Sequence, residues 1–184
     1  MYSFPAIEQK SSVITFGNRK TLKVGYYESG SGFPILFLHG LGASSDVWLP
    51  AIEKLRHKFH CYALDFPGHG HSDRSEDTDI YTNSNILDLT RVFCETIVKS
   101  PRFALVGNSV GGTLALLLVK QIPDSISQIV VVSPAGIGKE ISLRLRLATL
   151  PFLGELMFSP IILKIGFNVA RKQFKVSDYR YHLA

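Results

Sequence analysis

The sequence predicts an α/β protein, with a mostly parallel sheet and helices on both of its faces. Short apolar runs alternate with segments of helical periodicity, at about 30 residues per strand–helix unit. The runs are almost continuously apolar, which is typical of strands buried on both faces. They are Ile35–Leu38, His60–Leu64, Phe103–Val106 and Ile129–Val132.

The first half of the chain begins the alternation. Leu22–Glu28 is predicted as a strand, followed by a glycine turn and the strand Ile35–Leu38. Apolar residues then recur at helical spacing over Ser44–Lys58, and a serine at its start (Ser44 or Ser45) can cap this helix. His60–Leu64 follows as the next strand.

The second half repeats the unit. Asn83 or Ser84 can cap a helix whose apolar residues continue to Ile97. Phe103–Val106 is the next strand, and it leads into a glycine-rich helix over Ser109–Gln121. We therefore predict that the sheet continues to the end of the last β-branched run.

The chain changes character after Gly136. Leucines and phenylalanines crowd together there, and two prolines break the segment into short helices. Residues 1–138 are predicted to form the N-terminal part of a sheet-and-helix core, and residues 139–184 the beginning of a helical cap.

Composition excludes several classes of protein. The chain has 184 residues, of which 46% are hydrophobic and 19% charged, as in ordinary globular domains. Neither a secretory signal nor an apolar run of about 18 residues is present. Cys61 and Cys94 lie in apolar surroundings, so buried free thiols and a cytoplasmic location are expected. Because the chain lacks metal-binding Cys/His spacing, we expect no metal and no cofactor.

The charge is uneven along the chain. Residues 1–100 carry 10 basic and 11 acidic side chains, whereas residues 101–184 carry 10 and 4. A basic half can favour anionic partners, including a membrane surface contacted by residues 141–175. A cap packed over a ligand pocket is the preferred reading of that segment, and no nucleic-acid partner is expected. The oligomeric state is left open.

One motif carries chemistry. Gly107-Asn108-Ser109-Val110-Gly111 matches G-x-S-x-G, with an apolar strand before it and a helix after it. That setting is typical of a sharp turn which lifts a serine hydroxyl above the carboxyl ends of the strands. The glycines remove side chains that would clash in such a turn. A plain glycine-rich strand-to-helix turn is the alternative.

Two further motifs make the chain resemble the α/β-hydrolase family. His39-Gly40-Leu41-Gly42 is similar to the HG-x loop that supplies one oxyanion amide, and Asp65–Ser72 resembles the structural D-x-P-G-x-G-x-S loop. The resemblance implies that Ser109 is the nucleophile and that the amides of Leu41 and Val110 hold the oxyanion. His39, Gly40, Gly42 and Asn108 are then expected at the substrate pocket.

The resemblance implies a serine hydrolase of ester or related carbonyl bonds. Gly107–Gly112 is also similar to the G-N-S-M-G-G of hydrolases that cut carbon–carbon bonds, through Asn108. A small, moderately apolar ester or carbonyl substrate is expected. Ser109 argues against the branches of the family that use an aspartate nucleophile.

The acid and the histidine of a catalytic triad are not identified. The family order is Ser, then Asp or Glu, then His. Asp178 and His182 have this order but lie only four residues apart, so they are not favoured. We expect the C-terminal strands of the sheet, the acid and the histidine beyond residue 184, and little activity from this chain alone. A non-catalytic binding module is the alternative.

Overall fold

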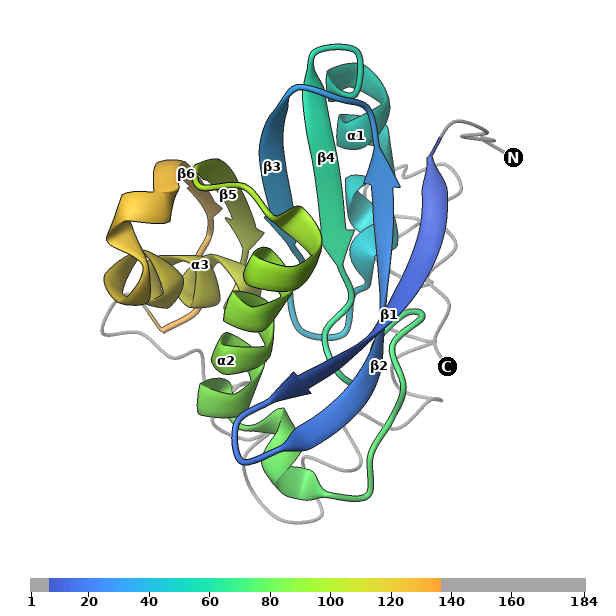
Figure 1. The fold of residues 1–184 in the computed structure, drawn as a ribbon, viewed down its shortest axis with the longest axis vertical. Helices are drawn as coiled ribbons and strands as arrows, with labels where there is room; N and C mark the ends of the chain where they lie inside the picture. The colour runs from blue at the N-terminus through green and yellow to red at the C-terminus, as the bar shows by residue number, and fades with distance from the viewer. Residues whose placement is uncertain (1–6, 137–184) are drawn as a thin grey trace, which may run out of the picture. The chain divides into compact units, whose positions relative to one another are not determined.

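The computed structural model describes residues 7–136 and shows a six-stranded sheet of order β1-β2-β4-β3-β5-β6 (Figure 1). Strands β3 to β6 pair in parallel, whereas β2 pairs antiparallel with both β1 and β4. The strands are β1 (Glu8–Phe16), β2 (Lys20–Ser29), β3 (Phe33–Leu38), β4 (Phe59–Leu64), β5 (Phe103–Asn108) and β6 (Ile126–Val132). The predicted mostly parallel α/β sheet is confirmed.

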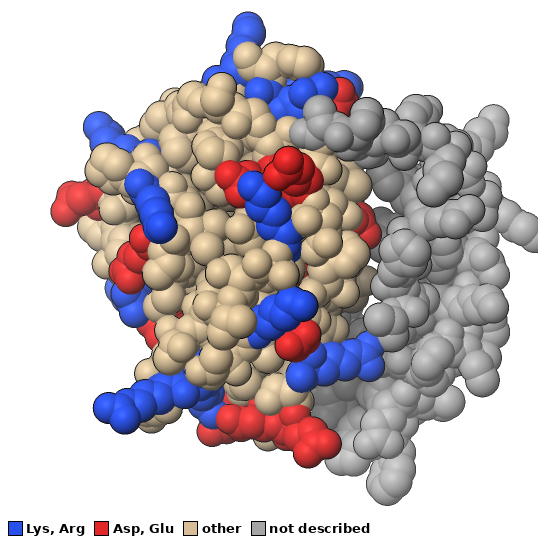
Figure 2. All heavy atoms as spheres, turned by 45° about the vertical axis from the view of Figure 1, so that its right-hand side comes forward, with Lys and Arg blue, Asp and Glu red and all other residues tan. Residues whose placement is uncertain are grey.

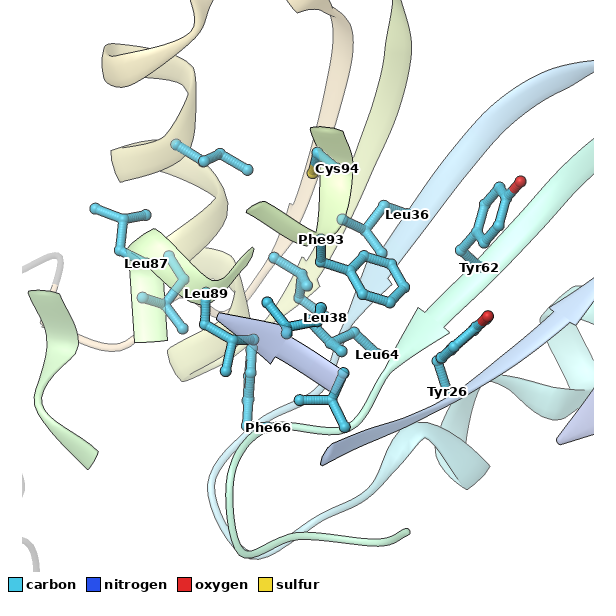
Figure 3. Packing of buried hydrophobic residues seen from close by; sticks show 14 of the residues in the cluster. Tyr26, Leu36, Leu38, Tyr62, Leu64, Phe66, Leu87, Leu89, Phe93 and Cys94 are labelled. Atoms are coloured by element: carbon cyan, nitrogen blue, oxygen red, sulfur yellow. The ribbon is translucent and has the colours of Figure 1, made fainter. Parts of the chain in front are cut away.

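Helices lie on both faces of this sheet (Figure 1). Alternate residues of β3 point to opposite faces, so each face of the strand packs against different helices. Leu36 and Leu38 pack in the core beneath α2 and α3, and Ile35 and Phe37 pack beneath α1. Figure 3 shows Phe93 of α2 directed towards the leucines of β3. The α-helices are α1 (Leu49–Leu55), α2 (Asn83–Phe93) and α3 (Val110–Gln121).

The helix predicted over residues 44–58 begins differently from the prediction. The helix predicted over residues 44–58 is a 3₁₀ turn, Ser45–Trp48, followed by α1, in which a proline occupies the first turn. Ser44 precedes the turn, but its hydroxyl donates to Asp46 instead of capping a backbone amide. Further 3₁₀ turns are Thr78–Tyr81 and Pro123–Ser125.

The predicted cap of α2 was wrong by one or two residues. Thr82 is the N-cap, since its hydroxyl accepts from the Asn85 amide, while Asn83 already lies in the helix. The helix then continues as a π-helical turn, Cys94–Val98, and ends at Lys99 in the left-handed conformation. The apolar pattern that reached Ile97 therefore predicted the length of this element correctly.

Strand β1 was not predicted from the sequence. It pairs along its whole length with β2 through a tight turn in which Gly17 and Arg19 both have positive φ. Ile14 and Phe16 are buried, whereas the residues between and before them are largely exposed. The apolar signal of β1 is thus confined to its last residues, which explains why a search for apolar runs misses it.

The described residues also bear on the predictions from composition. Cys61 and Cys94 are free and buried, as expected, and burial raises the pKa of Cys61 to about 11. Among residues 7–136, no helix has both the length and the apolar character needed to cross a bilayer. Figure 2 shows basic and acidic side chains intermixed on the face it presents. The cap predicted for residues 139–184 lies outside the described residues.

Candidate active site

Ser109 occupies a strained turn between β5 and α3. Its backbone angles are φ 51° and ψ −118°, a conformation that side-chain-bearing residues rarely adopt. The turn is fixed from both sides: the Ser109 amide donates to Val132 O at 2.9 Å, and Ser109 O accepts from the Ala135 amide at 3.1 Å. The surrounding backbone therefore holds the half-buried serine in place despite the strain.

The glycines of the motif allow the backbone to pack closely around this turn. A Cβ at Gly107 would lie 2.4 Å from Gly111 O, and a Cβ at Gly111 would lie 2.4 Å from Leu38 O. Both contacts are with backbone atoms, which cannot rotate away. The helix can thus begin against the end of β3 only because these positions lack side chains.

The loop that follows β3 lies beside Ser109. A Cβ at Gly40 would be 3.1 Å from Ser109 Cβ and 3.0 Å from Asn108 Oδ1. Leu41 is 61% exposed, and Gly42 has φ +70° with no atom within 4 Å of where its Cβ would lie. The structure therefore brings the two predicted motifs together at the carboxyl ends of β3 and β5.

Two backbone amides are available at this place. Val110 is the first residue of α3, and the first amides of a helix have no intrahelical acceptor. Between residues 7 and 136, neither the Leu41 amide nor the Val110 amide donates to a protein acceptor. Amides with this freedom can bind the oxygen of a tetrahedral intermediate, and the dipole of α3 adds to the effect.

His39 lies beneath the loop and is fully buried. Its Nε2 accepts from the Phe66 amide at 3.0 Å, so the proton is on Nδ1, which donates to Gly40 O at 2.8 Å. Burial lowers the pKa of His39 to about 4. With both nitrogens bonded to backbone, His39 supports the loop, and it is not available as a general base.

We expect His39 to remain neutral in the folded protein when the pH falls from 7 to about 5. The pKa of His39 lies near 4 when folded and near its usual 6.5 when unfolded. Between these values the unfolded chain takes up a proton that the folded chain does not. The free energy of unfolding therefore decreases as the pH is lowered, by about 3 kcal/mol over the whole window. Ring ¹⁵N shifts followed by NMR test this, and protonation of His39 by pH 6 would contradict it.

The loop after β4 is structural, as expected. Asp65 is fully buried, and its carboxylate accepts from the amides of Ser45 at 2.6 Å and His71 at 2.9 Å. Burial raises the pKa of Asp65, and these two hydrogen bonds oppose that rise. Ser72 Oγ donates to Asp65 O at 2.7 Å and accepts from the Gly25 amide at 2.9 Å. The loop therefore ties β2, β4 and the start of the 3₁₀ turn together.

The remaining candidate residues can be compared with the structure in the same way. Asn108 is half-buried and its amide group lies 3.4 Å from Val132 O, next to the serine. Asp178 and His182 lie outside the described residues. Sequence reasoning missed Tyr27 and Asp46, which hydrogen-bond at 2.8 Å near the loop. Among residues 7–136, no three His, Cys, Asp or Glu residues gather closely enough to hold a metal.

The strand order, the strained serine turn and the facing loop define a protein with α/β-hydrolase architecture. A family model described as the alpha/beta hydrolase fold matches residues 34–155. The chain therefore belongs to the α/β-hydrolase fold family, as the resemblance of its motifs implied.

Several relatives are longer than this chain. It is 32% identical over 143 residues to an uncharacterized protein of Mycobacterium tuberculosis, covering 77% of this chain and 39% of that protein. It is 35% identical over 104 residues to the monoacylglycerol lipase ABHD6 of Homo sapiens, covering 56% of this chain and 31% of the lipase. The chain thus spans well under half the length of these relatives.

Solved structures show the same fold. A candidate lipase from Acinetobacter baumannii superposes with a TM-score of 0.72 at 29% identity, covering 90% of this chain and 53% of that one. A bacterial membrane phospholipase A gives a TM-score of 0.65 at 27% identity, covering 76% and 44%. An epoxide hydrolase of Vigna radiata, at 22% identity and a TM-score of 0.65, shares the fold alone.

Proposed function

We propose that the protein is a serine hydrolase of ester or related carbonyl bonds, with Ser109 as nucleophile. One observation carries this proposal: the strained turn of Ser109 lies against the loop of Gly40 and Leu41, and neither the Leu41 amide nor the Val110 amide donates to an acceptor among the described residues. We expect the oxygen of a carbonyl group attacked by Ser109 to accept hydrogen bonds from the Leu41 and Val110 amides.

The reaction follows from these roles. Ser109 Oγ attacks the carbonyl carbon as a histidine takes its proton, and the amides stabilise the negative oxygen. The histidine returns the proton to the leaving alcohol, which gives an acyl-enzyme. Water then attacks the acyl carbon, releases the acid and restores Ser109. We expect the histidine and its orienting acid beyond residue 184, as the family order implies.

The substrate we propose is a small apolar ester. The exposed Leu41 presents apolar surface beside the nucleophile, and relatives include a monoacylglycerol lipase. Asn108, beside Ser109, supports carbon–carbon bond cleavage as the second reading. The buried free thiols suit a reducing compartment, and a cytoplasmic location stays a prediction.

A substrate panel separates these readings. Protein isolated from its native source would be assayed with p-nitrophenyl esters of increasing chain length, a monoacylglycerol and a vinylogous 1,5-diketone. We expect turnover of the esters, with a preference for longer acyl chains over the acetyl ester, and little cleavage of the diketone. The reverse preference would favour carbon–carbon cleavage. Absence of turnover in a folded protein would favour the non-catalytic binding module.

A further inference from the structure

The loop that carries the Leu41 amide is anchored at its ends and free in its middle. We call residues 39–44 the oxyanion loop. His39 fixes its start through Gly40 O and the Phe66 amide, and beyond its end the Ser45 amide donates to Asp65. Between these anchors, Leu41, Gly42 and Ala43 make only one hydrogen bond to the described residues, from the Ala43 amide to Gly40 O at 3.2 Å. The position of the Leu41 amide therefore depends on the anchors.

A second anchor at the far end joins the oxyanion loop to β2. Tyr27 Oη donates to Asp46 Oδ1 at 2.8 Å, and Asp46 Oδ2 accepts from Ser44 Oγ at 3.1 Å. One carboxylate thus links the last residue of the loop to β2. Burial, and then the hydrogen bond to Asp46, raise the pKa of Tyr27, so the phenol keeps its proton at neutral pH.

The phenol also contacts the loop after β4. Tyr27 Oη lies 3.4 Å from His71 Nε2, and the two rings meet edge to face with centroids 5.9 Å apart. The His71 amide in turn donates to Asp65, which holds Ser45. Tyr27 therefore stands where β2 and the loops after β3 and β4 meet, and it has no role in the chemistry described above.

We infer that Tyr27 and Asp46 are positioning residues that hold the oxyanion loop, and with it the Leu41 amide, in register with Ser109. This inference rests on the proposed function. Neither side chain contacts Ser109 among the described interactions, so their effect passes through the loop backbone. Because an oxyanion donor acts only when correctly placed, a small shift of the loop should reduce the rate of the chemical step more than substrate binding.

The test compares Tyr27→Phe, Asp46→Ala and the double variant with Tyr62→Phe. Tyr62 is a matched control, because it is a buried tyrosine of the same sheet whose phenol contacts His60 instead of the loop. Amide hydrogen exchange is followed at Ala43, Ser45 and Val47, whose amides all donate hydrogen bonds. Ester hydrolysis by the native-length protein gives kcat and KM separately.

We expect Tyr27→Phe to speed exchange at these amides about tenfold, and Asp46→Ala to speed it at least as much, because it also removes the acceptor of the Ser44 hydroxyl. The double variant should do no more than Asp46→Ala alone, because the Tyr27 hydroxyl acts on the loop through Asp46. In the same variants kcat should fall about tenfold while KM stays within about twofold. Tyr62→Phe should change neither the exchange of these amides nor kcat.

Unchanged exchange and kcat in Tyr27→Phe would overturn the inference, as would additive effects in the double variant or an equal effect of Tyr62→Phe. A failure of the proposed function looks different. The unsubstituted protein would then hydrolyse no ester, and hydrogen exchange alone would decide whether Tyr27 and Asp46 hold the loop.

Discussion

Replacing Ser109 with alanine is expected to remove ester hydrolysis almost completely. Loss of the nucleophile of a serine hydrolase lowers kcat by about 10³-fold or more, and the oxyanion amides alone recover little of this. Alanine adopts positive φ at about the same energetic cost as serine, so the strained turn should persist. Initial rates with the preferred p-nitrophenyl ester measure the effect.

A stability measurement shows whether the Ser109→Ala variant remains folded. Stability to urea should match that of the unsubstituted protein, because the Ser109 hydroxyl takes part in none of the described hydrogen bonds. Ser125→Ala should keep full activity, because Ser125 lies in the 3₁₀ turn before β6, at the opposite end of β5 and β6 from Ser109. Turnover above about a tenth of the original rate in Ser109→Ala would exclude Ser109 as the nucleophile.

Gly111→Ala should destabilise the fold strongly. A Cβ at this position would lie 2.4 Å from Leu38 O and 2.5 Å from His39 O, so β3 and α3 would have to separate. Overpacking against backbone, with no side chain able to move away, should cost about 3 kcal/mol or more. Urea unfolding measures this loss, and a failure to accumulate as folded protein would agree with it.

Gly112→Ala is the matched control for this prediction. Both glycines lie in the first turn of α3, so both variants gain the same higher helix propensity of alanine. A Cβ at Gly112 would meet Gly107 O at 3.1 Å and Pro134 Cβ at 3.2 Å, which a small shift can relieve. Its cost should stay below about 1 kcal/mol. Equal stability of the two variants would contradict the close approach of α3 to β3.

The sequence predicts best those features whose signal is local. The turn at Ser109 needs glycines within a few residues and an apolar strand before it, all of which are contiguous in the chain. Strands β3, β4 and β5 could be recognised for the same reason, since burial on both faces makes each an unbroken apolar run. Strand β6 was recognised from its β-branched residues, although its last valines are exposed. Strand β1 escaped because it is buried mainly near its end, at Ile14 and Phe16.

Contacts between distant residues could not be predicted in this way. Tyr27 and Asp46 are 19 residues apart, and nothing in either segment marks them as partners. Their meeting depends on the pairing of β2 with β4 and on where the 3₁₀ turn begins. The tautomer of His39 is a second example. The motif identified this residue, but its neutral form with the proton on Nδ1 depends on the hydrogen bond from the distant Phe66 amide.

The most direct test of the central claim is covalent labelling of the native protein with a fluorophosphonate, which reacts with activated serines. Trypsin cleaves after Arg102 and Lys120, so Ser109 falls in the peptide Phe103–Lys120 and is the only serine in it. We predict that mass spectrometry finds the phosphonyl group on this peptide, and that Ser109→Ala abolishes the label. A label on another peptide, or an equally labelled Ser109→Ala variant, would contradict the assignment of Ser109 as the nucleophile.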